Sequence, residues 1–173
     1  MKIALYLGSF NPFHNGHLEV IKTALNDFKV DKVVIVPTMQ NPWKKEKVLD
    51  IDKRIIVIEK SLLYNFWIEL YRLNISDIEK ELIPPYYSYA TLHALKNKYC
   101  NDKVFILCGE DTMKSIPDWM NGGKIIEDYD FLIVDRPKNS ISSTEIREKI
   151  KNNEPIDNLV SNNIINLIKK YYK

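Results

Sequence analysis

The sequence predicts an α/β protein with an open parallel sheet of about five strands, helices on both faces of the sheet and a C-terminal helical segment. Short apolar runs rich in β-branched residues have the length of buried strands, and they alternate with longer segments of helical period. This alternation is typical of a parallel, Rossmann-like sheet. The 173 residues, 45% of them hydrophobic, suffice for one core and contain no evident linker, so a single domain over residues 1–173 is expected.

Five short apolar runs are the predicted strands: KIALYLG (2–8), KVVIVP (32–37), FWIEL (66–70), KVFILCG (103–109) and DFLIVD (130–135). The predicted helices are 15–28, 50–64 and 88–98, followed by two more within 142–172 that Pro155 separates. In 50–64, apolar residues recur at the i, i+4, i+7 and i+11 positions of one helix face. The two C-terminal helices can complete the core or cover a partner, and the sequence indicates no oligomeric state.

The charge balance of the chain argues against a nucleic-acid partner. Its 25 basic and 23 acidic residues leave a formal charge of +2, too small for the footprint of a nucleic-acid-binding surface. No stretch approaches the ~20 apolar residues that cross a bilayer, and no cleavage site follows the apolar start MKIALYLGSF, so a cytoplasmic location is expected. Cys100 and Cys108 lack CxxC spacing and a nearby histidine pair, which argues against a zinc site or a disulfide framework.

The stretch GSFNPFHNGH, residues 8–17, directly follows the first predicted strand. In an open parallel sheet, ligands bind beyond the carboxyl ends of the strands. A helix that begins near Asn15 or Gly16 would point its first N–H groups into that crevice. His14 and His17 are three residues apart and can share one side of its first turn. Two imidazoles beside a helix N-terminus predict a phosphate site. The alternative is that both histidines have a structural role, with ring nitrogens that form hydrogen bonds to the backbone of the loop.

A second helix start, ISSTEIREKI at residues 141–150, follows the last predicted strand. Ser142 and the glutamate three residues later have the spacing of a capping box, with Ser142 as the N-cap residue. Ser143, Thr144 and Arg147 add hydroxyls and a guanidinium to this turn. Two such helix starts at one sheet edge predict a polyphosphate ligand. Neither stretch has GxGxxG or GK[ST] spacing, and HxxH without a third ligand is a weak metal motif.

These two stretches carry a resemblance to a known family. GSFNPFHNGH resembles the GSFxPxHxGH signature of nucleotidyltransferases with an HxGH motif, and ISSTEIR resembles their C-terminal ISSTxIR motif. Over nearly its whole length the chain is similar to one family among them, the bacterial nicotinate-nucleotide adenylyltransferases. The resemblance implies ATP and a pyridine mononucleotide as substrates, with Mg²⁺ carried by ATP and held by few or no protein ligands.

The resemblance places the following residues on ATP: Gly8, Ser9, Phe10, His14, Gly16, His17, Gly109, Asp111, Arg136, Ile141, Ser142, Ser143, Thr144 and Arg147. It implies catalytic roles for His14, His17, Lys44 and Arg147. Lys44 stands in VPTMQNPWKK where the family has a PPHK-like loop, with Trp43 in place of the histidine. Lys45 is an alternative to Lys44 in this role, and the other interpretation is that both lysines are simply solvated charges. Asp111 can meet a ribose hydroxyl or cap the next helix, and Arg136 can contact phosphate or adenine or lie on the surface.

The implied acceptor-binding residues are Asn11, Lys44, Tyr87, Ser88 and Trp119. PYYSYATL at 85–92 resembles the family segment PSYTxDTL, with Ala90 in place of the aspartate. Trp119 corresponds to an aromatic residue that, in the family, stacks on the pyridine ring of the acceptor. The alternative is that Trp119 only packs in the hydrophobic core.

Several other activities remain open at this point. An adenylyltransferase for nicotinamide mononucleotide or phosphopantetheine would share the phosphate sites, as would a cytidylyltransferase. The ISSTEIR helix favours ATP over CTP, and the PYYSYATL segment favours a flat pyridine acceptor. A nucleotide sensor without catalysis is the alternative from another class, although the complete set of phosphate-binding residues argues against it.

Overall fold

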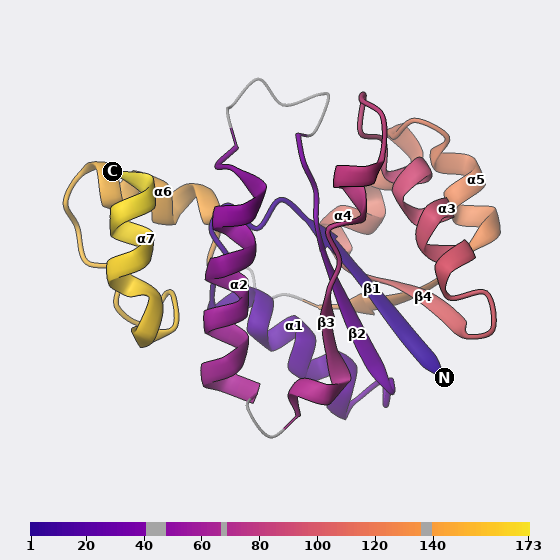
Figure 1. Ribbon diagram of the computed structural model, residues 1–173, viewed down its shortest axis with the longest axis horizontal. Helices are drawn as coiled ribbons and strands as arrows, with labels where there is room; N and C mark the ends of the chain where they lie inside the picture. The colour runs from indigo at the N-terminus through magenta and orange to yellow at the C-terminus, as the bar shows by residue number, and fades with distance from the viewer. Residues whose placement is uncertain (41–47, 67–68, 136–139) are drawn as a thin grey trace.

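Five parallel strands form one sheet in the order β3-β2-β1-β4-β5 (Figure 1). The computed structural model describes residues 1–40, 48–66, 69–135 and 140–173. The strands are β1 (Lys2–Gly8), β2 (Lys32–Pro37), β3 (Leu73–Ile75), β4 (Lys103–Gly109) and β5 (Asp130–Val134). The chain runs outward from β1 to β3 and then returns to the other side of β1 at β4. This reversal is a switch point. In open α/β sheets ligands bind at such a point, outside the carboxyl ends of the strands, which here are those of β1 and β4.

Helices cover both faces of the sheet (Figure 1). On one face lie α1 (Asn15–Asn26), α2 (Ile51–Phe66), α6 (Ser143–Lys151) and α7 (Ile165–Tyr172). On the other lie α3 (Ser88–Lys98), α4 (Glu110–Ser115) and α5 (Gly122–Asp128). Short 3₁₀ turns complete the connections: η1 (Leu70–Arg72), η2 (Ile78–Glu81), η3 (Ile116–Asp118) and η4 (Asn162–Ile164). The predicted fold class is confirmed.

Alternate residues of β1 point into two separate hydrophobic clusters. Ala4 and Tyr6 belong to the cluster formed with α1, α2, α6 and α7, whereas Ile3 and Leu5 belong to the cluster on the α3–α5 face. A strand alternates its side chains between the two faces of the sheet. Because both faces are covered, both sets must be apolar, which explains the continuous apolar runs in the sequence.

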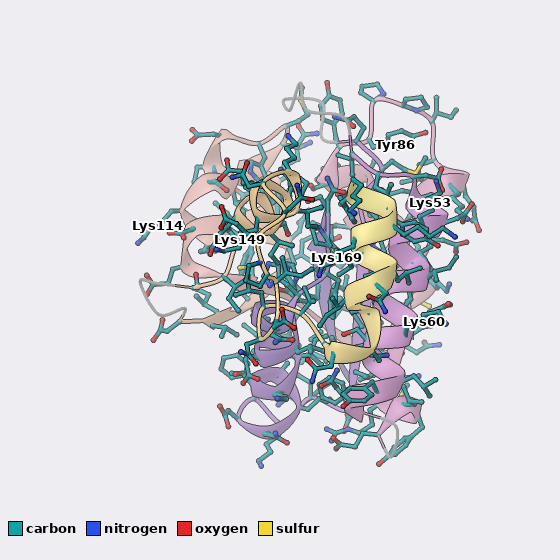
Figure 2. All side chains as sticks on the ribbon, turned by 90° about the vertical axis from the view of Figure 1, so that its left-hand side faces the viewer. Lys53, Lys60, Tyr86, Lys114, Lys149 and Lys169 are labelled. Carbon is teal, nitrogen blue, oxygen red and sulfur yellow. The ribbon has the colours of Figure 1, made fainter. Side chains whose placement is uncertain are left out.

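The C-terminal helices complete the core on the α1 and α2 face. Ile164 and Ile168 are fully buried in the same cluster as Ala4 of β1. α7 lies alongside α2 (Figure 2), and Nζ of Lys53 on α2 lies 5.5 Å from the ring centroid of Tyr171. Of the two roles left open by the sequence, the structure shows the first, a contribution to the core of this chain.

The sequence locates most elements, but it misplaces one strand and does not predict α4 and α5. The strands predicted at 2–8, 32–37 and 103–109 are confirmed to the residue. The strand predicted at 66–70 is wrong, because Phe66 ends α2 and the third strand is Leu73–Ile75. Phe66 lies four residues after Leu62 on the buried face of α2. The helical period of α2 therefore extends into the start of the run predicted as a strand. β3 has only three residues at the edge of the sheet, too few to give a periodic signal.

In the ranges that the structure describes, we find no helix with the length and apolar character required to cross a membrane.

Candidate functional site

The loop that joins β1 to α1 packs aromatic rings around the imidazole of His17. Phe10 takes a left-handed backbone conformation with φ of 46°, and its ring stands edge-on to the imidazole, with 4.9 Å between centroids. Phe13 and His14 stack on the same imidazole at centroid distances of 5.1 and 3.7 Å. His14 is 2% exposed and His17 9%. The predicted side-by-side placement of the two histidines is confirmed, and their surroundings hold both rings in place.

A hydrogen bond fixes the tautomer of His17. α1 begins at Asn15, as predicted, with His14 as its N-cap residue. The backbone N–H of His14 donates to Nδ1 of His17 at 3.1 Å. A ring nitrogen that accepts a hydrogen bond carries no proton, so the neutral imidazole is protonated on Nε2. Nε2 is therefore the nitrogen from which His17 can donate to a ligand.

The start of α6 is hydrogen-bonded to the loop that precedes α1. Ser142 is the N-cap residue of α6, as predicted, and its Oγ accepts the backbone N–H of Glu145 at 3.1 Å. Oγ of Ser143 donates to the carbonyl of Pro12 at 2.8 Å, across 131 positions of sequence. Arg147 donates through Nη1 to the carbonyl of Asn11 at 2.7 Å. The two sequence motifs therefore meet in space.

Gly16 lies so close to the His14 ring that a side chain at this position would force the ring to shift. A Cβ at Gly16 would lie 3.0 Å from Cε1 and Nδ1 of His14 and 3.7 Å from the carbonyl oxygen of Ile141. Ile141, the residue before the N-cap of α6, thus borders the first turn of α1. The first turn of a helix has N–H groups without intrahelical acceptors, and the Arg147 guanidinium, in the second turn of α6, is hydrogen-bonded to the loop at Asn11. Together these groups form a positively polarised junction that suits phosphate oxygens.

Arg54, which we did not single out from the sequence, is a buried guanidinium at the same edge of the sheet. It is 1% exposed. It donates to the carbonyls of Ser9 after β1, of Thr38 and Met39 after β2 and of Leu49 before α2, at 2.6, 2.7, 3.3 and 2.7 Å. One side chain therefore holds together three segments at the carboxyl edge. Burial lowers the pKa of Arg54, and nearby acidic groups act in the opposite direction.

The sequence does contain a signal for Arg54. It stands three residues after Ile51 and four before Ile58, which places it on the buried stripe of α2. The spacing of Ile51, Ile55, Ile58 and Leu62 predicts Ile55 on that stripe as well, but Ile55 is only partly buried. A charged residue within an apolar stripe indicates a buried polar role, because burying an unpaired charge is costly.

Glu79 is a second buried charge beside the chain that leaves β2. It is 1% exposed, and its carboxylate accepts the backbone N–H of Met39 and the hydroxyl of Thr91. Burial raises the pKa of Glu79 above its ordinary value, while those two donors and the charge of Arg54 act to lower it. Arg54 and Glu79 thus hold Met39 by its carbonyl and its N–H, respectively.

The remaining predicted residues lie on the α3–α5 side or outside the described residues. Tyr87 is the N-cap residue of α3, and Ser88 begins that helix. Trp119 is partly buried and packs against the cluster on this face. Asp111 is exposed in the first turn of α4, where Gly109 is the N-cap residue, so the capping role considered for Asp111 is wrong.

Two further predicted residues, Lys44 and Arg136, fall outside the described ranges.

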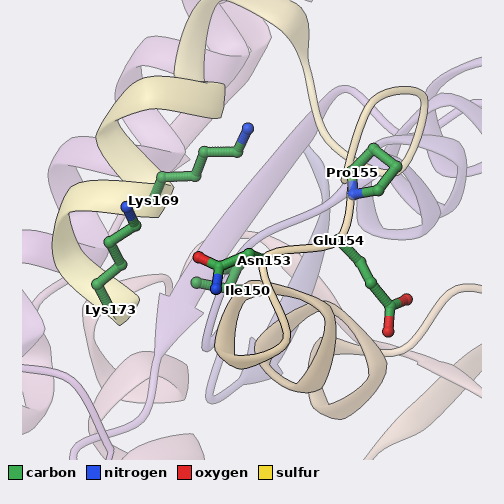
Figure 3. A pocket seen from close by; sticks show the side chains of 6 residues that line it. All are labelled: Ile150, Asn153, Glu154, Pro155, Lys169 and Lys173. Carbon is green, nitrogen blue, oxygen red and sulfur yellow. The ribbon is translucent and has the colours of Figure 1, made fainter.

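A cavity of about 270 Å³ lies between the C-terminal end of α6 and α7 (Figure 3). Its walls are formed by Ile150, Asn153, Glu154, Pro155, Lys169 and Lys173. The phosphate-binding candidates stand at the opposite end of α6, which has nine residues and is therefore about 13 Å long. This cavity is separate from the junction of the two motifs.

A parallel sheet with a switch point, and two helix starts that meet beside it, form a site suited to the phosphate groups of a nucleotide. The chain belongs to the cytidylyltransferase-like family, whose model matches residues 5–149, and within it groups with the nicotinate-nucleotide adenylyltransferases.

Two bacterial relatives illustrate that grouping. The probable nicotinate-nucleotide adenylyltransferase of Fusobacterium nucleatum is 32% identical, over 99% of this chain and 99% of its own. A protein of the same name from Campylobacter jejuni is 33% identical, over 100% of this chain and 97% of its own.

Solved structures share the fold. The putative nicotinate-nucleotide adenylyltransferase of Vibrio parahaemolyticus superposes with a TM-score of 0.81 at 21% identity, over 99% of this chain and 94% of its own. The nicotinic acid mononucleotide adenylyltransferase of Plasmodium falciparum, complexed with NaAD, gives a TM-score of 0.76 at 17% identity, over 98% of this chain and 93% of its own.

Proposed function

We propose that this protein transfers the adenylyl group of ATP to nicotinate mononucleotide, which gives nicotinate adenine dinucleotide and pyrophosphate. The observation that carries the proposal is the direct contact between the two phosphate-binding candidates, from Ser143 to Pro12 and from Arg147 to Asn11. The names of the bacterial relatives and the NaAD complex of the P. falciparum protein support the choice of acceptor. The whole chain acts as one domain, because α7 shares its core with β1.

The reaction needs no protein nucleophile. A phosphate oxygen of the mononucleotide attacks the α-phosphorus of ATP in line, a new P–O bond forms, and the bond to the β-phosphate breaks with release of pyrophosphate. The protein contributes by positioning both nucleotides and by stabilising charge on the transferring group. An arrangement of hydrogen-bond donors fixed before the substrates bind suits that task.

The described residues divide this work. His17 donates from Nε2 to a phosphate oxygen, because Nδ1 is occupied by the N–H of His14. His14, stacked on it, acts on the same phosphates. The Arg147 guanidinium stabilises charge on the departing pyrophosphate. The hydroxyl of Ser143 donates to Pro12, so Ser143 contributes its backbone N–H to the nucleotide and its side chain to the loop.

The groups implied by the family resemblance complete the site. We assign Lys44 to the triphosphate, Gly109, Asp111 and Arg136 to ATP, and Tyr87, Ser88 and Trp119 to the acceptor. Mg²⁺ enters with ATP. Among the described residues, no group of three or more His, Cys, Asp or Glu side chains could hold a metal ion, and the imidazole, hydroxyl and guanidinium donors at the junction complement phosphate oxygens. When bound, Mg²⁺ neutralises charge on the triphosphate.

Paired acceptors test this function. We expect initial rates of pyrophosphate release with Mg·ATP to be at least tenfold higher with nicotinate mononucleotide than with nicotinamide mononucleotide, a difference of about 1.4 kcal/mol. Comparable rates would mean a dual-specificity enzyme. Turnover only with phosphopantetheine, or only with CTP in place of ATP, would contradict the proposal, and tight ATP binding without any turnover would favour a sensor.

Gly16→Ala offers a second test with a matched control. Its Cβ would lie 3.0 Å from the His14 ring, so we expect His14 to shift and kcat/KM for ATP to fall about 10- to 100-fold while the protein stays folded. Gly123→Ala makes the same change in the first turn of α5, where a Cβ meets nothing within 4 Å, and it should keep wild-type kinetics. Equal kinetics in both variants would contradict a role for His14 in catalysis.

A further inference from the structure

Tyr172, the last residue of α7, reaches across the molecule to the loop that carries the histidines. Its hydroxyl donates to Oδ1 of Asn11 at 2.8 Å, across 161 positions of sequence. The backbone N–H of Leu49, just before α2, donates to the same oxygen at 3.2 Å. Asn11 is 5% exposed, and its backbone carbonyl accepts from Arg147. Asn11 is therefore the point where the loop, α2, α6 and α7 are joined.

These contacts orient the carboxamide of Asn11. A backbone N–H can only donate, so the side-chain atom that faces Leu49 is the oxygen. The amide nitrogen Nδ2 must then point away from Tyr172 and Leu49. Its two N–H groups donate to no other residue in the described parts of the chain, which leaves them available for a substrate. Nicotinate mononucleotide carries phosphate and carboxylate groups, both of which accept hydrogen bonds.

We propose that Tyr172 is a positioning residue for the acceptor nucleotide, acting through Asn11. The phenol fixes the carboxamide so that its N–H groups are presented to an anionic group of the acceptor. This inference rests on the function proposed above and adds to it a residue that neither sequence motif contains. It gives the C-terminal helix a role in substrate binding in addition to its place in the core.

The protonation state of Tyr172 suits this role, because a phenol donates only while protonated. Burial raises the pKa of Tyr172 above that of a free phenol, and the guanidinium groups of Arg54 and Arg147 only partly offset that rise. The hydroxyl is therefore a donor throughout the neutral range. The ring is partly buried and packs against the hydrophobic cluster on the α1 and α2 face.

Tyr172→Phe removes the hydroxyl and keeps the ring. We expect KM for nicotinate mononucleotide to rise about three- to tenfold, the usual effect of one lost hydrogen bond. KM for ATP and the melting temperature should stay near their wild-type values. Tyr171→Phe is the matched control: it removes the neighbouring hydroxyl, for which no hydrogen bond is found among the described residues, and it should leave both KM values unchanged.

A double-mutant cycle separates action through Asn11 from a general structural role. Asn11→Ala alone should raise KM for the acceptor at least as much as Tyr172→Phe, and adding Tyr172→Phe to Asn11→Ala should have no further effect. Additive effects of the two substitutions would overturn the proposal, as would a rise in both KM values or in neither. If the wild-type enzyme releases no pyrophosphate with this acceptor, the proposed function itself has failed, and the role of Tyr172 fails with it.

Discussion

His17→Ala should lower kcat for pyrophosphate release about 10²- to 10³-fold, the usual cost of removing one donor fixed against a developing charge. The substitution removes the N–H donor at Nε2 of His17. The proton is on Nε2 because Nδ1 accepts the backbone N–H of His14. It also removes one partner of the 3.7 Å ring stack and so loosens His14. Initial rates at saturating Mg·ATP and nicotinate mononucleotide measure the loss, and a thermal unfolding curve verifies that the variant is folded.

His93→Ala is the control for this prediction. His93 is exposed on α3 and lies 3.3 Å from the side chain of Asn97, so its loss should leave kcat unchanged. His17→Gln keeps an N–H donor near the position of Nε2 and should retain more activity than the alanine variant. A folded His17→Ala protein with near wild-type turnover would show that His17 has no catalytic role.

Arg54→Met should lower the free energy of unfolding by about 3–5 kcal/mol, because it removes buried, charge-assisted hydrogen bonds. Methionine fills much of the same volume but donates nothing, so the carbonyls of Ser9, Thr38, Met39 and Leu49 lose a buried donor. The midpoint of urea unfolding should fall with little change in slope. The folded fraction should also bind ATP more weakly, since Ser9 belongs to the loop before α1.

Arg72→Met distinguishes this effect from the general loss of an arginine. Arg72 also donates to backbone carbonyls, those of Leu25, Val30 and Asp31, and pairs with Glu69. Its side chain is 21% exposed, so water can replace part of the hydrogen bonding that the substitution removes. Val30 precedes β2, at the amino edge of the sheet, so kinetics should be unchanged. An Arg54→Met protein that unfolds at the wild-type urea concentration would show that the guanidinium does not hold this edge together.

Local patterns account for what the sequence predicted correctly. The runs that form β1, β2 and β4 are apolar on both faces because helices cover both sides of the sheet. The start of α6 at Ser143 follows from a capping preference within four residues. The stretch from Gly8 to His17 combines a strand end, a loop and a helix start. Such features depend on neighbours in sequence, so they can be identified before the chain is folded.

The sequence by itself therefore determined four of the five strands, the helices α1, α2, α3, α6 and α7, the two helix starts and the family, but not α4 or α5. Only the tertiary structure decided that β3 begins at Leu73, that Arg54 joins three segments, and that Tyr172 orients Asn11. The edge strand is too short to carry a period of its own. The other two features are hydrogen bonds across 45 and 161 positions. Their partners are backbone carbonyls and a carboxamide oxygen, groups whose positions depend on how the whole chain packs.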